Sequence, residues 1–444
     1  MYFCCDDAED QTTVISKTRS ASHEPAPASS IGGAALSAPA DIEVLTSTKG
    51  QQDLPRWFEA SFSVLKELEA GSIDIAIPDG RVFRVVGAAP GPAARIDIRN
   101  PAFFARIARD GELGFSEAYL DGWWDSPDLQ TFLDVLLTSS QWVNRSFPGA
   151  RLVRAWHQLN HWLNRNTRRQ ARKNIAAHYD LGNAFYSRWL DETMTYSSAL
   201  FETPADSLAA AQTRKYASVA DRIGVREGQH LLEIGCGWGG FAEYVAKERG
   251  ARLTGLTISR EQHDFARARI QAAGLNDRVE ILLRDYRDER GVYDGVASIE
   301  MIEAVGEKYW PAYFDAVRDR LKPGAQATIQ VITIPDSMFP TYRRTVDFIQ
   351  KYIFPGGMLP SPGELRAQIE RAGLTPVGSI TFGDSYSETL RRWHRDFEAA
   401  WGEIQTLGFD ERFRRMWAFY LTSCAAAFRT GTTDVAQVTM QRPA

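Results

Sequence analysis

The chain has 444 residues, 44% hydrophobic and 24% charged, a composition that predicts a globular protein of two or three domains and excludes a disordered, collagen-like or disulfide-stapled chain. A formal net charge of −5 disfavours nucleic acid as a partner, because proteins that bind polyanions are usually basic. Four cysteines without CxxC spacing predict a reducing compartment and no structural zinc, and we find neither a secretory signal nor an apolar run of about 18 residues that would span a membrane.

Residues 1–50 are predicted to be a disordered tail. Between positions 21 and 40, sixteen of twenty residues are Ala, Ser, Pro or Gly, which cannot bury enough apolar surface to offset the entropy of ordering. The tail carries seven acids and three bases, so it holds −4 of the net charge and leaves −1 for residues 51–444.

Residues 51–150 are predicted to form a small α+β domain. Two alternating apolar runs flank Pro78-Asp79-Gly80 within residues 72–85, which predicts a β-hairpin. Residues 100–125 have helical spacing with glycine breaks.

Residues 151–177 are predicted to form a basic amphipathic linker helix. Positions 151–174 hold seven bases and no acid, and one helical stripe is made of Leu152, Trp156, Leu159 and Leu163. Such a helix suits the surface of an anionic phospholipid bilayer. The alternative is an interdomain helix that packs on the core and turns its basic face to solvent.

From residue 215 onward, strand-like and helical runs alternate, which predicts an α/β fold with a doubly wound parallel sheet and helices on both faces. Strands are expected at 230–235, 251–258, 278–283, 293–299, 326–334, 375–382 and 434–440, and helices at 239–249, 259–273, 307–321 and within 386–428.

The strongest local motif is LLEIGCGWGG at 231–240, in which a predicted strand runs into a glycine loop, Gly235, Gly237 and Gly239, and then a helix. Glycines permit the tight turn and let a ligand approach the backbone. The same segment satisfies the dinucleotide pattern GxGxxG, so the motif alone is ambiguous.

Two details favour S-adenosylmethionine over a dinucleotide. The next strand ends at 255–259 without the acid that would bind a ribose, whereas Glu233 lies two residues before the first glycine, as in methyltransferases that use S-adenosylmethionine. Asp285 and Tyr286, after the third strand, can clamp the adenine by a hydrogen bond and stacking.

The chain resembles the cyclopropane-fatty-acyl-phospholipid synthase family over roughly residues 55–441. The motifs that carry the resemblance are HYDLGNAFYSRWLDETMTYSSALFE (178–202), LLEIGCGWGGFAEYVA (231–246), SIEMIEAVGEKYWPAYF (298–314), FIQKYIFPGGMLPS (348–361) and YLTSCAAAFRTGTTDVAQVTMQ (420–441). The resemblance implies a catalytic domain of class I methyltransferase fold at 178–444 and a lipid-associated N-terminal domain. It also implies methyl transfer from S-adenosylmethionine to a cis double bond of unsaturated phospholipid acyl chains.

The resemblance also implies roles for residues at the matching motif positions. His178 and Tyr179 match positions near the acyl channel. The cofactor contacts carried over are Tyr196, Ser197, Gly235, Thr257, Ile258, Gln262, Tyr286 and Ile299.

Methylation of an alkene leaves positive charge on the acyl chain, so the site has to exclude water and supply a base. In the family that base is generally a bound bicarbonate, held by a Cys, a Glu, a His, a Tyr and a backbone N–H. The family Glu and Tyr match Glu303 and Tyr386 here, whereas the Cys is Ser198 and the His is Gln330. Neither replacement can carry positive charge, which weakens the case for a bound anion.

Glu300 stands where the family usually has a small residue, three positions before Glu303. If residues 299–305 begin a helix, both carboxylates reach one pocket. We hypothesise that Glu300 replaces bicarbonate as the base or stabilises the cation; the alternative is that it points to solvent and bicarbonate remains a cofactor. The product, a cyclopropane or a methyl-branched chain, stays open.

Residues 335–362 are predicted to form a lid over the acyl chain. Phe348, Tyr352 and Ile353 are expected to line the channel, and the lipid phosphate is expected to meet Arg343, Arg344 and Lys351. The alternative is an ordinary amphipathic helix that packs on the sheet.

These observations favour a C-methyltransferase that acts on phospholipid acyl chains. Two other interpretations are a small-molecule methyltransferase and a lipid-binding protein that has lost catalysis. We expect the protein in the cytoplasm, peripherally bound to the inner face of the cell membrane, with a second copy of the chain as a candidate partner.

Overall fold

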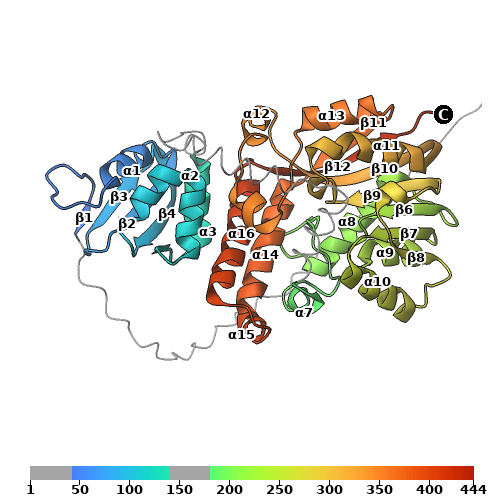
Figure 1. The fold of residues 1–444 in the computed structure, drawn as a ribbon, viewed down its shortest axis with the longest axis horizontal. Coiled ribbons are helices and arrows are strands. Elements are labelled where there is room, and N and C mark those ends of the chain that lie inside the picture. The colour runs from blue at the N-terminus through green and yellow to red at the C-terminus, as the bar shows by residue number, and fades with distance from the viewer. Residues whose placement is uncertain (1–42, 140–180) are drawn as a thin grey trace, which may run out of the picture. The chain divides into compact units, whose positions relative to one another are not determined.

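A computed structural model describes residues 43–139 and 181–444 (Figure 1). The predictions for residues 1–42, for the basic linker helix at 151–177 and for His178 and Tyr179 lie outside the described residues. Among the helices that the structure describes, none is long and apolar enough to cross a bilayer.

A five-stranded sheet in the order β1-β3-β2-β4-β5 forms the centre of the N-terminal part. Its strands are β1 (Val44–Leu45), β2 (Ala70–Ala76), β3 (Val82–Val86), β4 (Ala89–Ile98) and β5 (Trp124–Asp125). The antiparallel pairing of β2 with β3 confirms the predicted hairpin. Because β1 pairs with β3, the prediction of disorder through residue 50 is wrong at these two apolar positions, where a short edge pairing offsets the ordering cost.

Three helices accompany this sheet: α1 (Phe58–Leu65), α2 (Phe103–Leu120) and α3 (Leu129–Thr138). Helix α2 is kinked at Gly111, where φ is 60° and ψ is −134°, a conformation that a residue with a side chain rarely adopts. The glycine break expected within residues 100–125 therefore lies at Gly111. The kink divides α2 into two segments with different directions.

The second sheet has seven strands in the order β11-β12-β10-β9-β6-β7-β8. They are β6 (His230–Ile234), β7 (Arg252–Thr257), β8 (Val279–Leu283), β9 (Tyr293–Ile299), β10 (Leu321–Thr333), β11 (Thr375–Thr381) and β12 (Asp434–Gln441). Strands β6 to β10 are parallel as predicted, but β12 runs antiparallel to both of its neighbours. The purely parallel prediction is wrong there, because an apolar strand has the same pattern in either direction.

Helices cover both faces of this sheet (Figure 1). One core contains residues of α8 (Leu208–Ile223), α9 (Gly240–Glu248) and α10 (Arg260–Ala272), and another contains residues of α11 (Trp310–Arg320) and α13 (Pro362–Arg371). Beyond the sheet, α14 (Gly383–Ala399) packs beside α16 (Glu411–Arg429), and α15 (Trp401–Gln405) lies between them in the chain.

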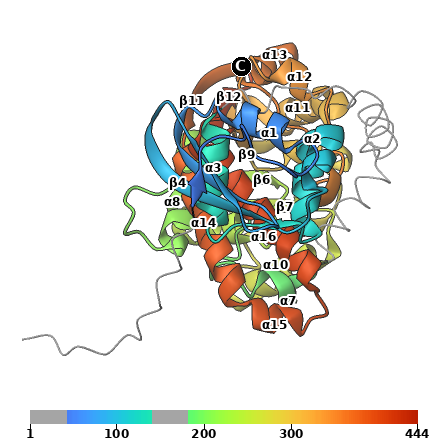
Figure 2. The ribbon, with the colours of Figure 1, turned by 90° about the vertical axis from the view of Figure 1, so that its left-hand side faces the viewer.

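The N-terminal part and α16 share one aromatic core, in which α16 contacts both α2 and α3 (Figure 2). Phe419 of α16 lies 6.2 Å from Phe115 and 5.5 Å from Tyr119 between ring centroids. Arg415 donates hydrogen bonds to the carbonyl oxygens of Tyr119 and Trp124 at 2.6 and 2.9 Å. The two sheets are therefore joined by buried packing as well as by the chain.

Candidate active site

The glycine loop lies where the sequence predicts it, between β6 and α9. Gly235, Gly237 and Gly239 have φ values of 84°, 51° and 83°, in the left-handed region that favours glycine. A Cβ on Gly235 would lie 2.8 Å from Cγ of Met301, so this position tolerates no side chain without a shift. Gly239 faces Ala266 of α10, where a Cβ would lie 3.1 Å from the alanine Cβ, and it serves helix packing.

Replacing Gly235 by alanine is expected to weaken cofactor binding about 10-fold, since the added methyl group strains the loop and displaces Met301. Titration calorimetry with S-adenosylhomocysteine measures this. Gly224→Ala is the matched control, because Gly224 has a φ of 75° but open space around it. Equal affinities of both variants and the wild type would contradict a cofactor role for the loop.

A cavity of about 640 Å³ opens at the carboxyl ends of β6 to β9, the usual ligand site of such sheets. The sequence-predicted cofactor residues come together on its wall, with the exception of Gly239: Tyr196, Ser197, Glu233, Gly235, Gly237, Thr257, Ile258, Gln262, Asp285, Tyr286 and Ile299. These residues are far apart in the chain, and they meet because successive parallel strands end at the same edge of the sheet.

Two carboxylates on this wall differ in their hydrogen bonding. Asp285 is paired with Arg287, which donates to both carboxylate oxygens at 2.8 and 2.6 Å. Glu233 is buried in β6, its Oε2 has no hydrogen-bond partner, and burial raises its pKa to about 8. An unsatisfied carboxyl oxygen beside a glycine loop fits a ligand that brings hydroxyl or amino donors, as S-adenosylmethionine does.

Glu300 follows β9 and points into the protein. Its Oε1 accepts hydrogen bonds from the backbone N–H of Ser198 at 2.8 Å and from Nε2 of Gln330 at 2.7 Å, and its Oε2 accepts the Tyr386 hydroxyl at 2.6 Å. The alternative of a solvent-facing Glu300 is therefore wrong. Burial raises the pKa of Glu300, and the three hydrogen bonds oppose that shift.

The predicted helical geometry around Glu300 is also wrong. Its φ is 48°, in the left-handed region, and the short helix η2 (Ile302–Ala304) begins only after it. The backbone N–H of Glu300 donates to the carbonyl of Gln330 at 2.8 Å, which holds this unusual conformation. A left-handed turn, rather than a shared helical face, brings Glu300 to the same cavity as Glu303.

Two of the groups that hold the Glu300 carboxylate, Gln330 and Tyr386, match positions that the family resemblance assigns to bicarbonate, and the third is a backbone N–H, as in that assignment. Ser198 contributes its backbone N–H, because its hydroxyl donates to the carbonyl of Ala199 at 2.9 Å. Gln330 is fixed in turn by Gln437 of β12, whose Nε2 donates to the Gln330 Oε1 at 3.2 Å. The side chain of Glu300 thus occupies a ready-made carboxylate site.

Glu303 has a different environment within the same cavity. Its Oε1 accepts the backbone N–H of Ile332 at 2.6 Å, and its Oε2 has no partner. Burial and the nearby Glu300 charge raise the pKa of Glu303 to about 8. The cavity therefore holds two carboxyl groups in different hydrogen-bonding environments.

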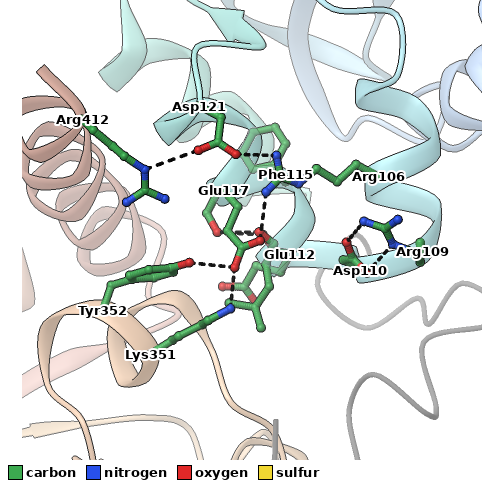
Figure 3. Close-up of polar contacts among 12 residues, drawn as sticks. Arg106, Arg109, Asp110, Glu112, Phe115, Glu117, Asp121, Lys351, Tyr352 and Arg412 are labelled. Atoms are coloured by element: carbon green, nitrogen blue, oxygen red, sulfur yellow. Dashed lines mark hydrogen bonds and ion pairs between the residues drawn. The ribbon is translucent and has the colours of Figure 1, made fainter. Parts of the chain in front are cut away.

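Of the three apolar residues expected to line the channel, one lies on the cavity wall. Phe348 is buried, lines the cavity and packs on Phe419 with ring centroids 5.0 Å apart. Ile353 is buried away from the cavity wall. Tyr352, in the π-helical turn η4 (Ile349–Ile353), is not among the residues that line the cavity, and its hydroxyl donates to Oε1 of Glu117 in α2 at 2.8 Å (Figure 3). The helical spacing of residues 348–353 could not predict the contact with Glu117, because spacing carries no information about a residue that is distant in the chain.

The lid cations expected at a lipid phosphate have protein partners. Nζ of Lys351 lies 2.5 Å from the same Glu117 oxygen, and Arg343 pairs with Glu307. Arg344 is exposed and also interacts within the protein. The headgroup role of Arg343, Arg344 and Lys351 stays a prediction, and in this structure carboxylates pair with Arg343 and Lys351.

Glu117→Gln is expected to destabilise the protein by about 1–2 kcal/mol at neutral pH, since it removes charge-assisted hydrogen bonds. Burial opposes ionisation, but hydrogen bonds from Lys351, Tyr352 and Arg106 hold the pKa of Glu117 below its usual value. This stabilisation is present above the carboxyl's unfolded pKa, near 4.5, and is lost as pH falls through the lower folded value.

Thermal unfolding across pH measures the difference, which should vanish in acid. The control is Asp110→Asn, which removes only the Arg109 pair on the surface of α2 (Figure 3). If Glu117→Gln were as stable as Asp110→Asn at neutral pH, the hydrogen bonds of Glu117 would not contribute the predicted stability.

Sequence analysis missed the part of the cavity wall that comes from the N-terminal helices. Their contribution consists of Ile107, Gly111, Glu112, Phe115, Leu133, Leu136 and Leu137. The spacing of the leucines in α3 was the available signal, but it is the same as that of any core-facing helix. Sequence analysis also missed Lys215 of α8, a fully buried lysine behind the site.

A family model described as mycolic acid cyclopropane synthetase matches residues 166–438. A tuberculostearic acid methyltransferase of Mycobacterium tuberculosis is 44% identical over 366 residues, 80% of this chain and 85% of that protein. A cyclopropane-fatty-acyl-phospholipid synthase of Escherichia coli is 35% identical over 388 residues, 83% of this chain and 96% of that protein. The crystal structure of a mycolic acid cyclopropane synthase with SAH and CTAB has a TM-score of 0.58 at 29% identity, over 61% of this chain and 98% of that one.

Proposed function

Because the chain belongs to the mycolic acid cyclopropane synthetase family and is an S-adenosylmethionine-dependent C-methyltransferase of lipid acyl chains, we propose that it methylates the cis double bond of unsaturated acyl chains in membrane phospholipids. The relative from Escherichia coli is named for acyl phospholipids, and it matches this chain over 83% of its length. The relatives disfavour both a small-molecule methyltransferase and a lipid-binding protein without catalysis.

The observation that carries the proposal is the continuity of the cavity. One space joins the glycine loop, the carboxyl groups of Glu300 and Glu303 and an apolar wall that includes Phe348 and Leu136. An acyl chain placed along the apolar wall brings its double bond beside the cofactor face. Such alignment is most of what this reaction needs, because an alkene is a weak nucleophile.

S-Adenosylmethionine, when bound, supplies an electrophilic methyl group. The apolar wall excludes water that would otherwise capture the positive charge left on the acyl chain. Glu300 then accepts a proton at its carboxylate, and Tyr386, Gln330 and the Ser198 N–H hold that carboxylate in place. Glu303 contributes a second carboxyl group, whose pKa is raised by burial and by the Glu300 charge.

In this proposal Glu300 replaces bicarbonate as the base. The support is that Glu300 occupies the donors that would otherwise hold the anion. Removal of a proton from the transferred methyl gives a cyclopropane, and removal from the neighbouring chain carbon gives a methyl-branched alkene. The hydrogen that faces Glu300 decides between these products.

We place the reaction at an anionic phospholipid surface on the cytoplasmic face of the membrane. The support is the sequence of residues 151–174, with seven bases and no acid. Peripheral binding through this segment would present acyl chains to the cavity.

The test is expression in cells that contain monounsaturated lipids, followed by mass spectrometry of separated lipid classes. Phospholipid acyl chains that gain one CH₂ unit are the expected result, and NMR distinguishes a cyclopropane from a branched alkene. Cells that produce Gly235→Ala serve as the cofactor-deficient control. A gain confined to non-phospholipid classes, or none while the purified protein binds cofactor, would contradict the proposal.

A further inference from the structure

A fully buried lysine lies directly behind the site. Lys215 of α8 is the only lysine or arginine that is fully buried among residues 43–139 and 181–444. Its Nζ donates a hydrogen bond to Oγ of Ser197 at 2.6 Å and lies 4.8 Å from the ring centroid of Tyr216. A buried ammonium group is costly unless opposite charges compensate it.

Three carboxyl groups from separate parts of the chain act electrostatically on Lys215. Burial lowers the pKa of Lys215 to about 7, and the charges of Glu300, Asp191 and Glu233 oppose that shift. Of these three, Glu300 has the largest effect. Lys215 itself does not line the cavity, so it does not touch the reacting groups.

Two consecutive residues, Ser197 and Ser198, connect Lys215 to Glu300. Lys215 bonds the side chain of Ser197, and the next residue, Ser198, donates its backbone N–H to Glu300 Oε1. Gln212, three residues before Lys215 on the same helix, donates to the Ser197 carbonyl at 2.9 Å. Helix α8 therefore holds Ser197 by two contacts, of which only the one from Lys215 carries a charge.

The other groups that face Glu300 supply no positive charge. Tyr386 from α14, Gln330 from β10 and the Ser198 N–H are neutral donors, and Glu303 from η2 is a second carboxyl group. The positive charge that opposes the rise in the pKa of Glu300 is that of Lys215.

We propose that Lys215 is a positioning residue whose positive charge keeps Glu300 ionised in the cavity and thereby able to accept the proton of the reaction. This inference rests on the proposed role of Glu300 as the base. The inference gives α8 a role in the reaction through Lys215, which contacts neither the cofactor nor the acyl chain.

The test compares Lys215→Met with Gln212→Leu, the matched control that removes the uncharged contact to the same loop. The pH dependence of kcat is measured on vesicles of monounsaturated phospholipid, together with the Kd of S-adenosylhomocysteine. Lys215→Met should move the acid limb of the kcat profile to a pH about one unit higher, because Glu300 becomes harder to ionise. At pH values on the acid side of that limb, kcat should fall about 10-fold. Gln212→Leu should leave the limb in place. An unmoved limb in Lys215→Met, or equal shifts in both variants, would overturn the inference.

Two further measurements separate the possible failures. Lys215→Gln keeps a donor for Ser197 without the charge and should behave as Lys215→Met does; wild-type behaviour of this variant counts against the inference. Infrared difference spectra between the wild type and Glu300→Gln need no Lys215 variant, and they should show an ionised Glu300 at pH 7. A protonated Glu300 there would overturn the inference directly. Full activity of Glu300→Gln would instead remove the proposed base.

Discussion

Replacing Glu300 by glutamine should lower kcat about 1,000-fold while cofactor affinity stays nearly unchanged. Glutamine keeps the size of the side chain but cannot accept the proton, and a positioned general base typically contributes 10²–10⁴-fold. Incorporation of labelled methyl groups into phospholipid vesicles measures the rate. Glu307→Gln is the control, since Glu307 is an acid that pairs with Arg343 and does not line the cavity.

The variant Glu300→Gly makes the same test sharper. It leaves the Ser198 N–H, Gln330 and Tyr386 without their carboxylate, and these donors should then bind bicarbonate from solution. Added bicarbonate is expected to restore part of the activity of Glu300→Gly and to leave the wild type unaffected. A wild-type enzyme that requires bicarbonate, together with an active Glu300→Gln, would exclude Glu300 as the base.

Leu136→Trp should reduce kcat/KM for phospholipid about 10–100-fold without changing the Kd of the cofactor. Leu136 lies in α3 of the N-terminal part yet lines the cavity, so the larger ring occupies space that an acyl chain would use. Hydrophobic pockets discriminate by about this amount for small changes in occupied volume. Assays with acyl chains of several lengths should show the greatest loss for the longest chains.

The control for Leu136→Trp is Leu129→Trp, on the same helix but outside the cavity wall. Thermal unfolding of both variants separates lost stability from lost substrate binding. Equal kinetics for the two variants would show that α3 does not bound the acyl site.

Sequence reasoning predicted the parts of the site that strict backbone geometry imposes. Gly235 follows a buried strand, precedes a helix and has a positive φ. Because this conformation favours glycine, the residue type itself predicts it. Thr257 and Asp285 follow from the rule that parallel strands end at one edge of a sheet. Such local rules leave clear marks in a single sequence.

The remaining features depend on contacts between distant segments. Tyr352 has the spacing of a channel residue, but its partner is Glu117, more than 200 positions earlier in the chain. Leu136 and Lys215 have ordinary helical patterns, and only the packed structure places one on the cavity and the other behind Glu300. The left-handed backbone of Glu300 is equally invisible, since glutamate does not favour it.

At position 300, the residue that the backbone conformation favours differs from the residue that the proposed chemistry needs. With φ at 48°, this site suits glycine better than glutamate, and a strained non-glycine residue typically costs about 1–3 kcal/mol. Substitution by glycine would therefore relieve this strain, although it also removes the base and leaves the Ser198 N–H, Gln330 and Tyr386 without their acceptor. Backbone preference alone would favour glycine at this position, so retention of the glutamate in a lineage would be a signature of selection for its carboxylate.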